Sequence, residues 1–267
     1  MITSQTNGRI RYVTDLLAKS RLRKKDGKFV AEGIKMFMEA PLPLIEEVYV
    51  SEELEQKINR AFPEDKALAD KLSKVNYEVV TDSIFKKISD TVTPQGIVSV
   101  IKMQKYTLDD ITGGNNPLIV MLENLQDPGN LGTVIRTAEG AGVDGIVLSR
   151  DCVDIYNPKV TRSTMGSIFR QKFVIAEDLC ETMEMVKKRN IGVYAAALKS
   201  DSLTYDSADL SKPCAVLIGN EGNGLKEETI KCASETIFIP MEGQLESLNA
   251  SVAAAILVYE AKRQRNR

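Results

Sequence analysis

The strongest constraint on the fold is a series of short apolar runs in the second half of the chain. Continuous apolar runs are typical of strands buried on both faces of a parallel sheet. The runs are Leu118–Leu122, Ile146–Leu148, Val193–Ala197, Ala215–Ile218 and Thr236–Ile239. Stretches with helical character lie between or after them, at residues 131–141, 159–168, 178–189, 225–232 and 248–264. This alternation predicts an α/β fold, with a parallel sheet covered by helices on both faces.

The first hundred residues also alternate between strand-like and helical segments. Helical segments are expected at 9–22, 51–61 and 83–89, and strands at 46–50, 75–80 and 96–103. Residues 29–40 fit either a helix or a strand that passes into a helix. The Gly, Asn and Pro residues of Gly113–Pro117 are typical of a linker. We therefore predict a smaller N-terminal α/β domain at 1–103, a linker at 104–116 and a second domain at 117–267.

Composition excludes several classes of protein. The 267 residues include no histidine, which rules out Ser-His-Asp and Cys-His hydrolases. The four cysteines lie too far apart in sequence for a zinc site, and we expect reduced, buried thiols; they are Cys152, Cys180, Cys214 and Cys232. No apolar stretch reaches the roughly 18 residues of a membrane span, and the polar N-terminus lacks a signal core. We therefore expect a cytoplasmic protein with no membrane or metal partner.

The net charge of the whole chain is −2, but its N-terminal segment is basic. Within the first thirty residues, only Asp15 and Asp26 are acidic, whereas the basic side chains are Arg9, Arg11, Lys19, Arg21, Arg23, Lys24, Lys25 and Lys28. Such a cluster fits a phosphate-binding surface or a solvated helix face equally well. The candidates for RNA contact within it are Arg21, Arg23, Lys24 and Lys25. The basic C-terminal residues fit a solvated helix face and a frayed tail.

Three polar loops directly follow predicted strands, at residues 123–130, 219–224 and 240–247. Ligands of parallel α/β sheets bind in the loops at the carboxyl ends of the strands. Taken singly, each loop could be an ordinary turn, with Asn130 or Ser247 capping the next helix. The glycines at 219, 222 and 224 precede Leu225, so the Gly-Lys-Ser/Thr of a P-loop is missing, and no dinucleotide fingerprint is present.

Three segments resemble the motifs of the SpoU/TrmH RNA 2′-O-ribose methyltransferases, part of the SPOUT superfamily. They span residues 122–138, 217–225 and 239–251, in the family's order and spacing, and Asn157–Gly166 resembles a further family segment. The N-terminal part of the chain resembles, less specifically, the family's substrate-binding domain, and its segment Thr93–Ile97 fits that resemblance. The resemblance implies a parallel-sheet SPOUT domain with a deep trefoil knot, and a smaller N-terminal α/β RNA-binding domain. It also implies S-adenosyl-L-methionine (AdoMet) as cofactor and a homodimer.

The resemblance also implies roles for individual residues. The polar catalytic set would be Asn130, Arg136, Glu221 and Asn249. The cofactor would contact Gly219, Ile239, Met241 and Leu248. Ser247 would bind the reacting nucleotide. Because arginine stays protonated in proteins, Arg136 is expected to clamp the target phosphate and lower the pKa of the ribose hydroxyl. An ion pair with Glu221 or Glu139 is the alternative use of Arg136.

The expected function is AdoMet-dependent methylation of a ribose 2′-hydroxyl in RNA, with 23S rRNA favoured by the separate N-terminal domain. A tRNA 2′-O-methyltransferase is the first alternative. A non-catalytic RNA-binding or ribosome-assembly protein on the same scaffold is the second, although such a protein would not need all four polar residues of the catalytic set. A nucleotide-binding oxidoreductase is a weaker rival because its fingerprint is absent.

Overall fold

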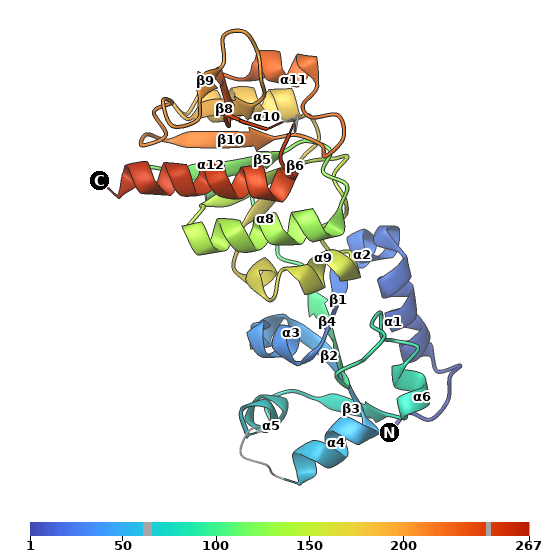
Figure 1. Cartoon of the computed structure of the whole chain (residues 1–267). Coiled ribbons are helices and arrows are strands. Elements are labelled where there is room, and N and C mark those ends of the chain that lie inside the picture. The colour runs from blue at the N-terminus through green and yellow to red at the C-terminus, as the bar shows by residue number, and fades with distance from the viewer. Residues whose placement is uncertain (61–65, 244–246, 267) are drawn as a thin grey trace. The chain divides into compact units, whose positions relative to one another are not determined.

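The computed structural model describes residues 1–60, 66–243 and 247–266 (Figure 1). The chain forms two compact units, which are described separately. The first contains Met1–Gln104 together with Tyr156–Phe169, and the second contains Lys105–Ile155 together with Arg170–Arg267.

The first unit is a four-stranded sheet with helices on both faces. The strands follow the order β1-β4-β2-β3, with β4 antiparallel to both neighbours and β2 parallel to β3. Its strands are β1 (Lys28–Glu32), β2 (Ile45–Ser51), β3 (Tyr77–Val80) and β4 (Ile97–Lys102). Its helices before residue 104 are α1 (Gly8–Ala18), α2 (Ser20–Asp26), α3 (Ile34–Glu39), the 3₁₀ turn η1 (Leu42–Leu44), α4 (Glu52–Asn59), α5 (Lys66–Leu72) and α6 (Asp82–Phe85).

Alternation along β2 divides this unit into two cores. Tyr49 packs with α1 and α6 on one face, while Val48 and Val50 pack with α3, α4 and α5 on the other. Successive strand residues point to opposite faces of a sheet, so the strand must be apolar on both. Ser51 accepts a hydrogen bond from the Leu54 amide (3.2 Å) and is therefore the N-cap of α4.

A late segment of the chain completes the first unit. Helix α9 (Pro158–Ser163) packs against β1, and the 3₁₀ turn η3 (Ser167–Phe169) follows it. The Phe29 ring lies 4.6 Å from the Tyr156 ring and 6.3 Å from the Phe169 ring, centroid to centroid. The sequence placed the domain boundary at the Gly, Asn and Pro cluster before residue 118, and so it assigned residues 156–169 to the second domain. The aromatic contacts with β1 instead group them with the first unit.

The expected linker also contains structure. Thr107 begins helix α7 (Leu108–Thr112) with a capping box that includes Asp110. Ile111 is buried in the core of the second unit, and a Cβ atom on Gly145 would overlap it. Residues 105–116 therefore pack as part of the second unit.

The second unit is a seven-stranded sheet in which every paired strand is parallel, as predicted. Its strands are β5 (Leu118–Leu122), β6 (Gly145–Ser149), β7 (Phe173–Ala176), β8 (Gly192–Ala196), β9 (Leu203–Thr204), β10 (Cys214–Ile218) and β11 (Glu235–Phe238). Its further helices are α8 (Pro128–Ala141), α10 (Leu179–Lys187), α11 (Glu227–Cys232) and α12 (Ala250–Arg265). The sequence did not predict the two edge strands β7 and β9.

The strand order β7-β6-β5-β10-β8-β11-β9 departs from the chain order at two places. Strand β10 lies between β5 and β8, and β11 lies between β8 and β9, which are consecutive in sequence. Helices α8 and α12 lie side by side on one face of the sheet (Figure 1). Helices α10 and α11 pack on the other face, over a core that includes Met121, Met183 and Leu217. The predicted trefoil knot stays a prediction.

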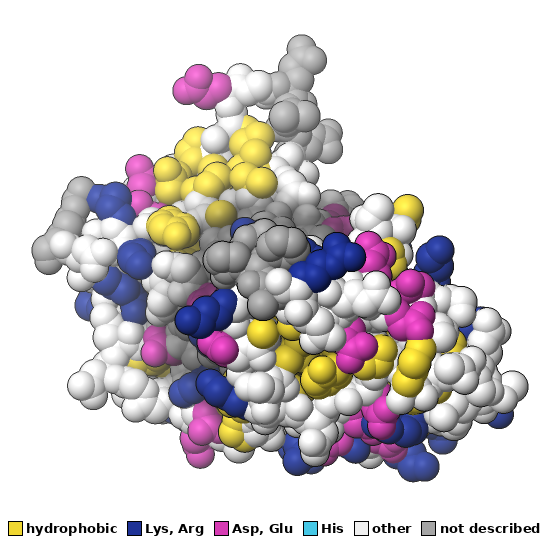
Figure 2. Space-filling model, turned by 90° about the horizontal axis from the view of Figure 1, so that it is seen from below, with side chains coloured by type: hydrophobic (Ala, Val, Ile, Leu, Met, Phe, Trp, Pro, Cys, Tyr) yellow, Lys and Arg dark blue, Asp and Glu magenta, His cyan; other side chains and the backbone are white. Residues whose placement is uncertain are grey.

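The surface carries both signs of charge. On the face shown in Figure 2, basic side chains lie among acidic ones instead of covering one continuous area. Within the part of the chain that the structure describes, none of the helices combines the length and the apolar character of a membrane span.

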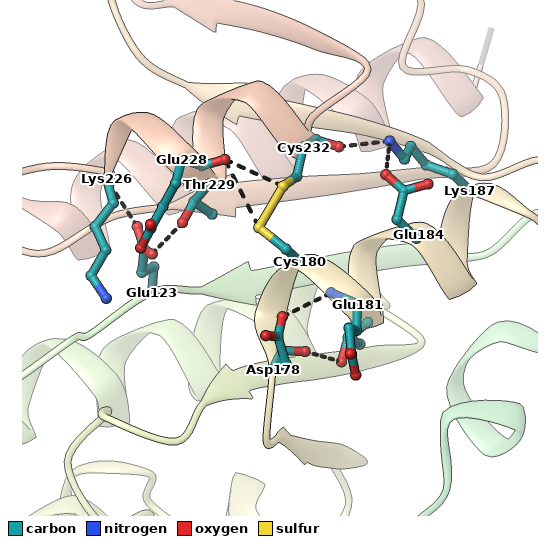
Figure 3. The surroundings of a disulfide bond; sticks show 11 residues. Glu123, Asp178, Cys180, Glu181, Glu184, Lys187, Lys226, Glu228, Thr229 and Cys232 are labelled. Carbon is teal, nitrogen blue, oxygen red and sulfur yellow. Dashed lines mark hydrogen bonds and ion pairs between the residues drawn. A yellow bond between two sulfur atoms is a disulfide. The ribbon is translucent and has the colours of Figure 1, made fainter.

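Two of the four cysteines, expected from the sequence to be reduced thiols, form a disulfide. Cys180, in the first turn of α10, and Cys232, the last residue of α11, form a disulfide with their Cα atoms 5.8 Å apart (Figure 3). The two residues are 52 positions apart in sequence, but α10 and α11 pack together, which brings them into contact. Cys152 and Cys214 are free thiols, as expected.

Candidate active site at the carboxyl edge of the parallel sheet

The carboxyl ends of β5 and β10 lie side by side in the middle of the second sheet. Leu122 and Ile218 are paired at the last position of these strands, so Glu123 and Gly219 start their loops together. Strand order reverses at this point, which is where open α/β sheets bind their ligands. The third loop follows β11 and leads into α12.

Three side chains of the predicted catalytic set form a hydrogen-bonded chain that links these loops. Asn130 donates from Nδ2 to Glu221 Oε1 (3.1 Å). Asn249 donates from Nδ2 to Asn130 Oδ1 (3.0 Å). Asn130 therefore joins the loop after β10 to the start of α12.

Local capping explains why Asn130 is available for this role. The N-cap of α8 is Asp127, whose carboxylate accepts from the Asn130 amide (2.7 Å), and Pro128 occupies the first helical position. Asn130 thus lies inside the helix, and its side chain points to other partners. Asn249 is itself the N-cap of α12 and accepts from the Ser251 amide (2.9 Å), which orients its amide group.

Glu221 is held as a carboxylate by several donors. Besides Asn130, its oxygens accept from the Asp127 amide (3.0 Å), the Gln126 amide (3.3 Å) and Asn220 Nδ2 (3.3 Å). Partial burial alone would raise the pKa of Glu221, but the hydrogen bonds from Asn130 and from backbone amides hold it below its usual range. Glu221 is therefore charged at neutral pH, and it is a weak base.

Arg136 stands apart from this network. It is exposed on α8 and has no hydrogen bond or ion pair with any other residue in the described part of the chain. Glu139, one of its two expected partners, is paired with Arg170. Arg136 follows Asn130 by six positions, which is about 120° around an α-helix, so the two side chains leave α8 in different directions.

The residues expected to bind the cofactor lie around the same edge. Gly219 is buried, and a Cβ atom there would overlap the backbone of Gly224, so glycine is required for the loop to close on itself. Ile239 and Leu248 are half-buried, and Met241 is exposed. Aliphatic side chains suit the faces of an adenine ring.

Two further observations complete the third loop. Ser247 is exposed at its end, one residue before Leu248, and it does not cap α12. Residues 244–246, within the third motif, lie outside the described residues.

The basic N-terminal cluster divides into two kinds of side chain. Arg21, Lys24 and Lys25 are exposed on α2. Arg23 is only 3% exposed, and its Nη1 donates to the carbonyl oxygens of Leu16 (2.6 Å) and Leu17 (3.0 Å). The break between α1 and α2 leaves these carbonyls without helical partners, and Arg23 satisfies them. This corrects the expectation that Arg23 contacts RNA.

Sequence reasoning missed one buried carboxylate at this edge. Glu123 is 4% exposed and accepts hydrogen bonds from the Lys226 amide (2.9 Å) and from Thr229 Oγ1 (2.5 Å). Glu123 directly follows a strand that is apolar at every position, and this position could have revealed it. An acidic residue next to a buried strand is itself expected to be buried, and it then needs hydrogen-bond donors.

Comparison with known proteins finds family models that match both parts of the chain. Residues 117–259 match the model of the SpoU rRNA methylase family, and residues 7–99 match that of the MRM3-like substrate-binding domain. The chain is 35% identical to the 23S rRNA (guanosine(2553)-2′-O)-methyltransferase RlmP of Bacillus subtilis over 184 residues, which cover 69% of this chain and 71% of that protein. It is 30% identical to human mitochondrial rRNA methyltransferase 3, covering 93% of this chain and 70% of that protein.

Solved structures match the chain over nearly its whole length. The AdoMet-bound rRNA methyltransferase from Sinorhizobium meliloti superimposes with a TM-score of 0.83 at 30% identity, covering 98% of this chain and 97% of that one. The SpoU methyltransferase AviRb from Streptomyces viridochromogenes, in complex with AdoMet, superimposes with a TM-score of 0.84 at 27% identity, covering 97% of this chain and 98% of that one. Since the family model spans more than half of the sequence, the chain belongs to the SpoU rRNA methylase family.

Proposed function

We propose that this protein transfers a methyl group from AdoMet to a ribose 2′-hydroxyl of rRNA, with the large-subunit rRNA as the favoured substrate. The observation that carries the proposal is the chain of hydrogen bonds through Glu221, Asn130 and Asn249, which ties together the three loops at the carboxyl edge of the sheet. The relatives named as 23S rRNA 2′-O-methyltransferases support the choice of substrate, and bacterial relatives favour the cytoplasm as its location.

When bound, AdoMet supplies an electrophilic methyl group on a sulfonium ion. The residues of this chain must then align the ribose oxygen with that carbon, so that the O–C bond forms as the S–C bond breaks. Alignment of this kind is worth roughly 7–11 kcal/mol in well-oriented systems. Asn130 and Asn249 are oriented by their own hydrogen bonds, and we assign them to holding the nucleotide and the cofactor loop in register.

The proton of the 2′-hydroxyl must leave during attack. The chain has no histidine, and Glu221 is committed to amide donors with its pKa below the usual range. We therefore assign the proton to an RNA phosphate oxygen or to water. Arg136, with its guanidinium free of partners among the described residues, would bind that phosphate and lower the pKa of the hydroxyl.

We further propose a homodimer that brings Arg136 of one subunit to the site of its partner. Val252 (46% exposed) and Tyr259 (49%) lie seven positions apart on α12, with half-buried Ile256 between them, and so share one helix face. Tyr259 lies over α8, since a Cβ atom on Gly140 would be 3.5 Å from its hydroxyl. Gly140 and Arg136 lie four positions apart on the same face of α8. The apolar face of α12 therefore adjoins, through Tyr259 and Gly140, the face of α8 that carries Arg136. In the proposed dimer a second copy covers this face, and Arg136, which leaves α8 in a different direction from Asn130, is assigned to the partner's site.

In the first unit, Arg21, Lys24 and Lys25 would contact phosphates of structured RNA, which proteins recognise largely by shape. Ser247 would contact the target nucleotide beside the cofactor. These contacts give the MRM3-like domain the role of holding the RNA while the second unit reacts.

The test is methyl transfer from labelled AdoMet to total RNA from a strain that lacks the protein, followed by mapping of the labelled 2′-O-methyl position. Arg136→Ala should abolish transfer while AdoMet binding stays near normal. Lys212→Ala, an exposed cation of the same unit, serves as the matched control and should leave transfer unchanged. If only tRNA is labelled, the substrate is tRNA and the proposal of rRNA is wrong. If no methyl group is transferred to rRNA, tRNA or intact ribosomal subunits, the proposed methylation is wrong and a non-catalytic RNA-binding role takes its place.

A further inference from the structure

Glu123 is a buried carboxylate that the reaction itself does not use. It follows the last residue of β5, and its side chain points at the first turn of α11, where it meets Lys226 and Thr229 (Figure 3). Both oxygens are used, one by the Lys226 amide and the other by the Thr229 hydroxyl, and Thr229 is itself only 2% exposed. Burying a carboxylate without hydrogen-bond donors costs free energy, and these two donors compensate the burial of Glu123.

Glu123 fastens the loop after β10 at both of its ends. Its backbone amide donates to the Ile218 carbonyl (2.9 Å), where that loop begins. Its side chain holds the Lys226 amide, where the loop ends. The segment between them contains Gly219, expected to bind the cofactor, and Glu221.

Glu221 makes the reciprocal contact. Its carboxylate reaches back from the loop after β10 to the amides of Gln126 and Asp127, in the loop after β5. Each of the two loops therefore contributes one glutamate that holds the other. Since the loop after β10 carries three glycines and is conformationally permissive, its bound shape depends on these contacts.

We propose that Glu123 is a positioning residue that sets the affinity for AdoMet by holding residues 219–226 in the shape that binds the cofactor. The proposal rests on the function proposed above. Glu123 acts through the loop, with no contact to the reacting atoms, so its loss should weaken cofactor binding and leave the methyl-transfer step itself almost unchanged.

The far end of α11 is secured independently. The disulfide joins Cys232 to Cys180, and Lys187 Nζ donates to the Cys232 carbonyl (2.8 Å) (Figure 3). Removing the Glu123 carboxylate therefore frees only the end of α11 that adjoins the loop. We expect Glu123→Ala to remain folded, with a modest fall in the melting temperature.

The experiment compares AdoMet dissociation constants by calorimetry with kcat at saturating AdoMet and RNA. Glu123→Ala removes both hydrogen bonds, each worth about threefold, and should raise the dissociation constant about tenfold, with kcat within about twofold. Glu123→Gln should recover most of the affinity. Its amide oxygen can accept from Lys226, and its NH₂ group can donate to the Thr229 hydroxyl, which also accepts.

Two threonine variants separate positioning from stability. Thr229→Val keeps the carboxylate and removes one of its donors, and it should raise the AdoMet dissociation constant about threefold. Thr182→Val removes a similarly buried hydroxyl, bonded to the Asp178 carbonyl (2.7 Å) on α10. It should lower stability by a similar amount and leave AdoMet binding unchanged.

Normal AdoMet binding by Glu123→Ala or by Thr229→Val, with only a loss of stability, would overturn the proposal. If Glu123→Ala does not fold, Thr229→Val decides alone, and an unchanged dissociation constant counts against the positioning role. Failure of the wild-type protein to bind AdoMet would instead overturn the proposed function. The two failures are therefore distinguishable from one set of titrations.

Discussion

Removing the Cys180–Cys232 disulfide should destabilise the second unit by up to about 4 kcal/mol. The cross-link closes a loop with a sequence separation of 52 residues. In the chain-entropy description, closing a loop restricts the unfolded chain by about 3 kcal/mol for 15 residues and about 4.7 kcal/mol for 100, which places this loop near 4 kcal/mol. The enclosed segment includes β8, β9, β10 and the loop after β10, and so it contains two inner strands of the sheet and part of the site.

The folded state should change little when the cross-link is lost. Helices α10 and α11 pack together through Met183, Val186 and Ile230 over the shared core, and these contacts do not depend on the sulfur atoms. Both cysteines are half-buried, so replacing them by alanine removes little apolar contact. The expected loss therefore comes almost entirely from the greater freedom of the unfolded chain.

Urea unfolding measures this effect directly. The oxidised wild type, the wild type with a thiol reductant and the double variant Cys180→Ala, Cys232→Ala would be compared. With a slope of about 3 kcal/mol per molar urea, the midpoint of the second unit should fall by about 1 M in the last two samples. The reductant should have no effect on the double variant. A reduced wild type that unfolds at the midpoint of the oxidised protein would refute the entropic reasoning.

Two further predictions concern charge. The folded pKa of Glu221 is depressed below its usual value of 4.5, so its stabilising contacts are fully present above that value and are lost as pH falls through the lower, folded pKa. The affinity for AdoMet should therefore stay constant from neutral pH down to the folded pKa of Glu221 and fall only in stronger acid. Glu221→Gln should bind AdoMet weakly at neutral pH and lack this acid-dependent loss. An equal acid loss in both proteins would point to another group. In the first unit, Arg23→Ala should lower the melting temperature because the Leu16 and Leu17 carbonyls lose their donor, whereas Lys24→Ala should weaken RNA binding and flatten its salt dependence with stability unchanged. Identical behaviour of the two variants would contradict the division of the basic cluster.

Hydrophobic patterning predicted the central strands well and the edge strands poorly. Strands β5 and β10 are buried at every position, so their sequences are continuous apolar runs that stand out by inspection. Strand β7 lies at an edge of the sheet, and Ile175 within it is 45% exposed, so it lacks a comparable pattern. Strand β9 has only two residues, Leu203 and Thr204, which is too short for any periodicity.

Burial separated residues that looked alike in the sequence. Arg23 lies in a run of basic residues and is chemically similar to Lys24, but only Arg23 turns inward to the end of α1. Its direction depends on the break between two helices. Composition cannot reveal that break, since the same residues would fit one continuous helix.

The sequence by itself determined most of the local elements: the central strands, the longer helices, and the loops that follow buried strands. These follow from the spacing of apolar residues, which is a short-range property of the chain. Tertiary structure alone decided which side chains meet. Glu221 and Asn130 are 91 residues apart, and Asn130 and Asn249 are 119 apart. They come together because β10 inserts beside β5 and α12 returns along α8, and strand order is set by packing of the whole sheet. The same packing places Cys180 against Cys232, whereas contacts with β1 group residues 156–169 with the first unit.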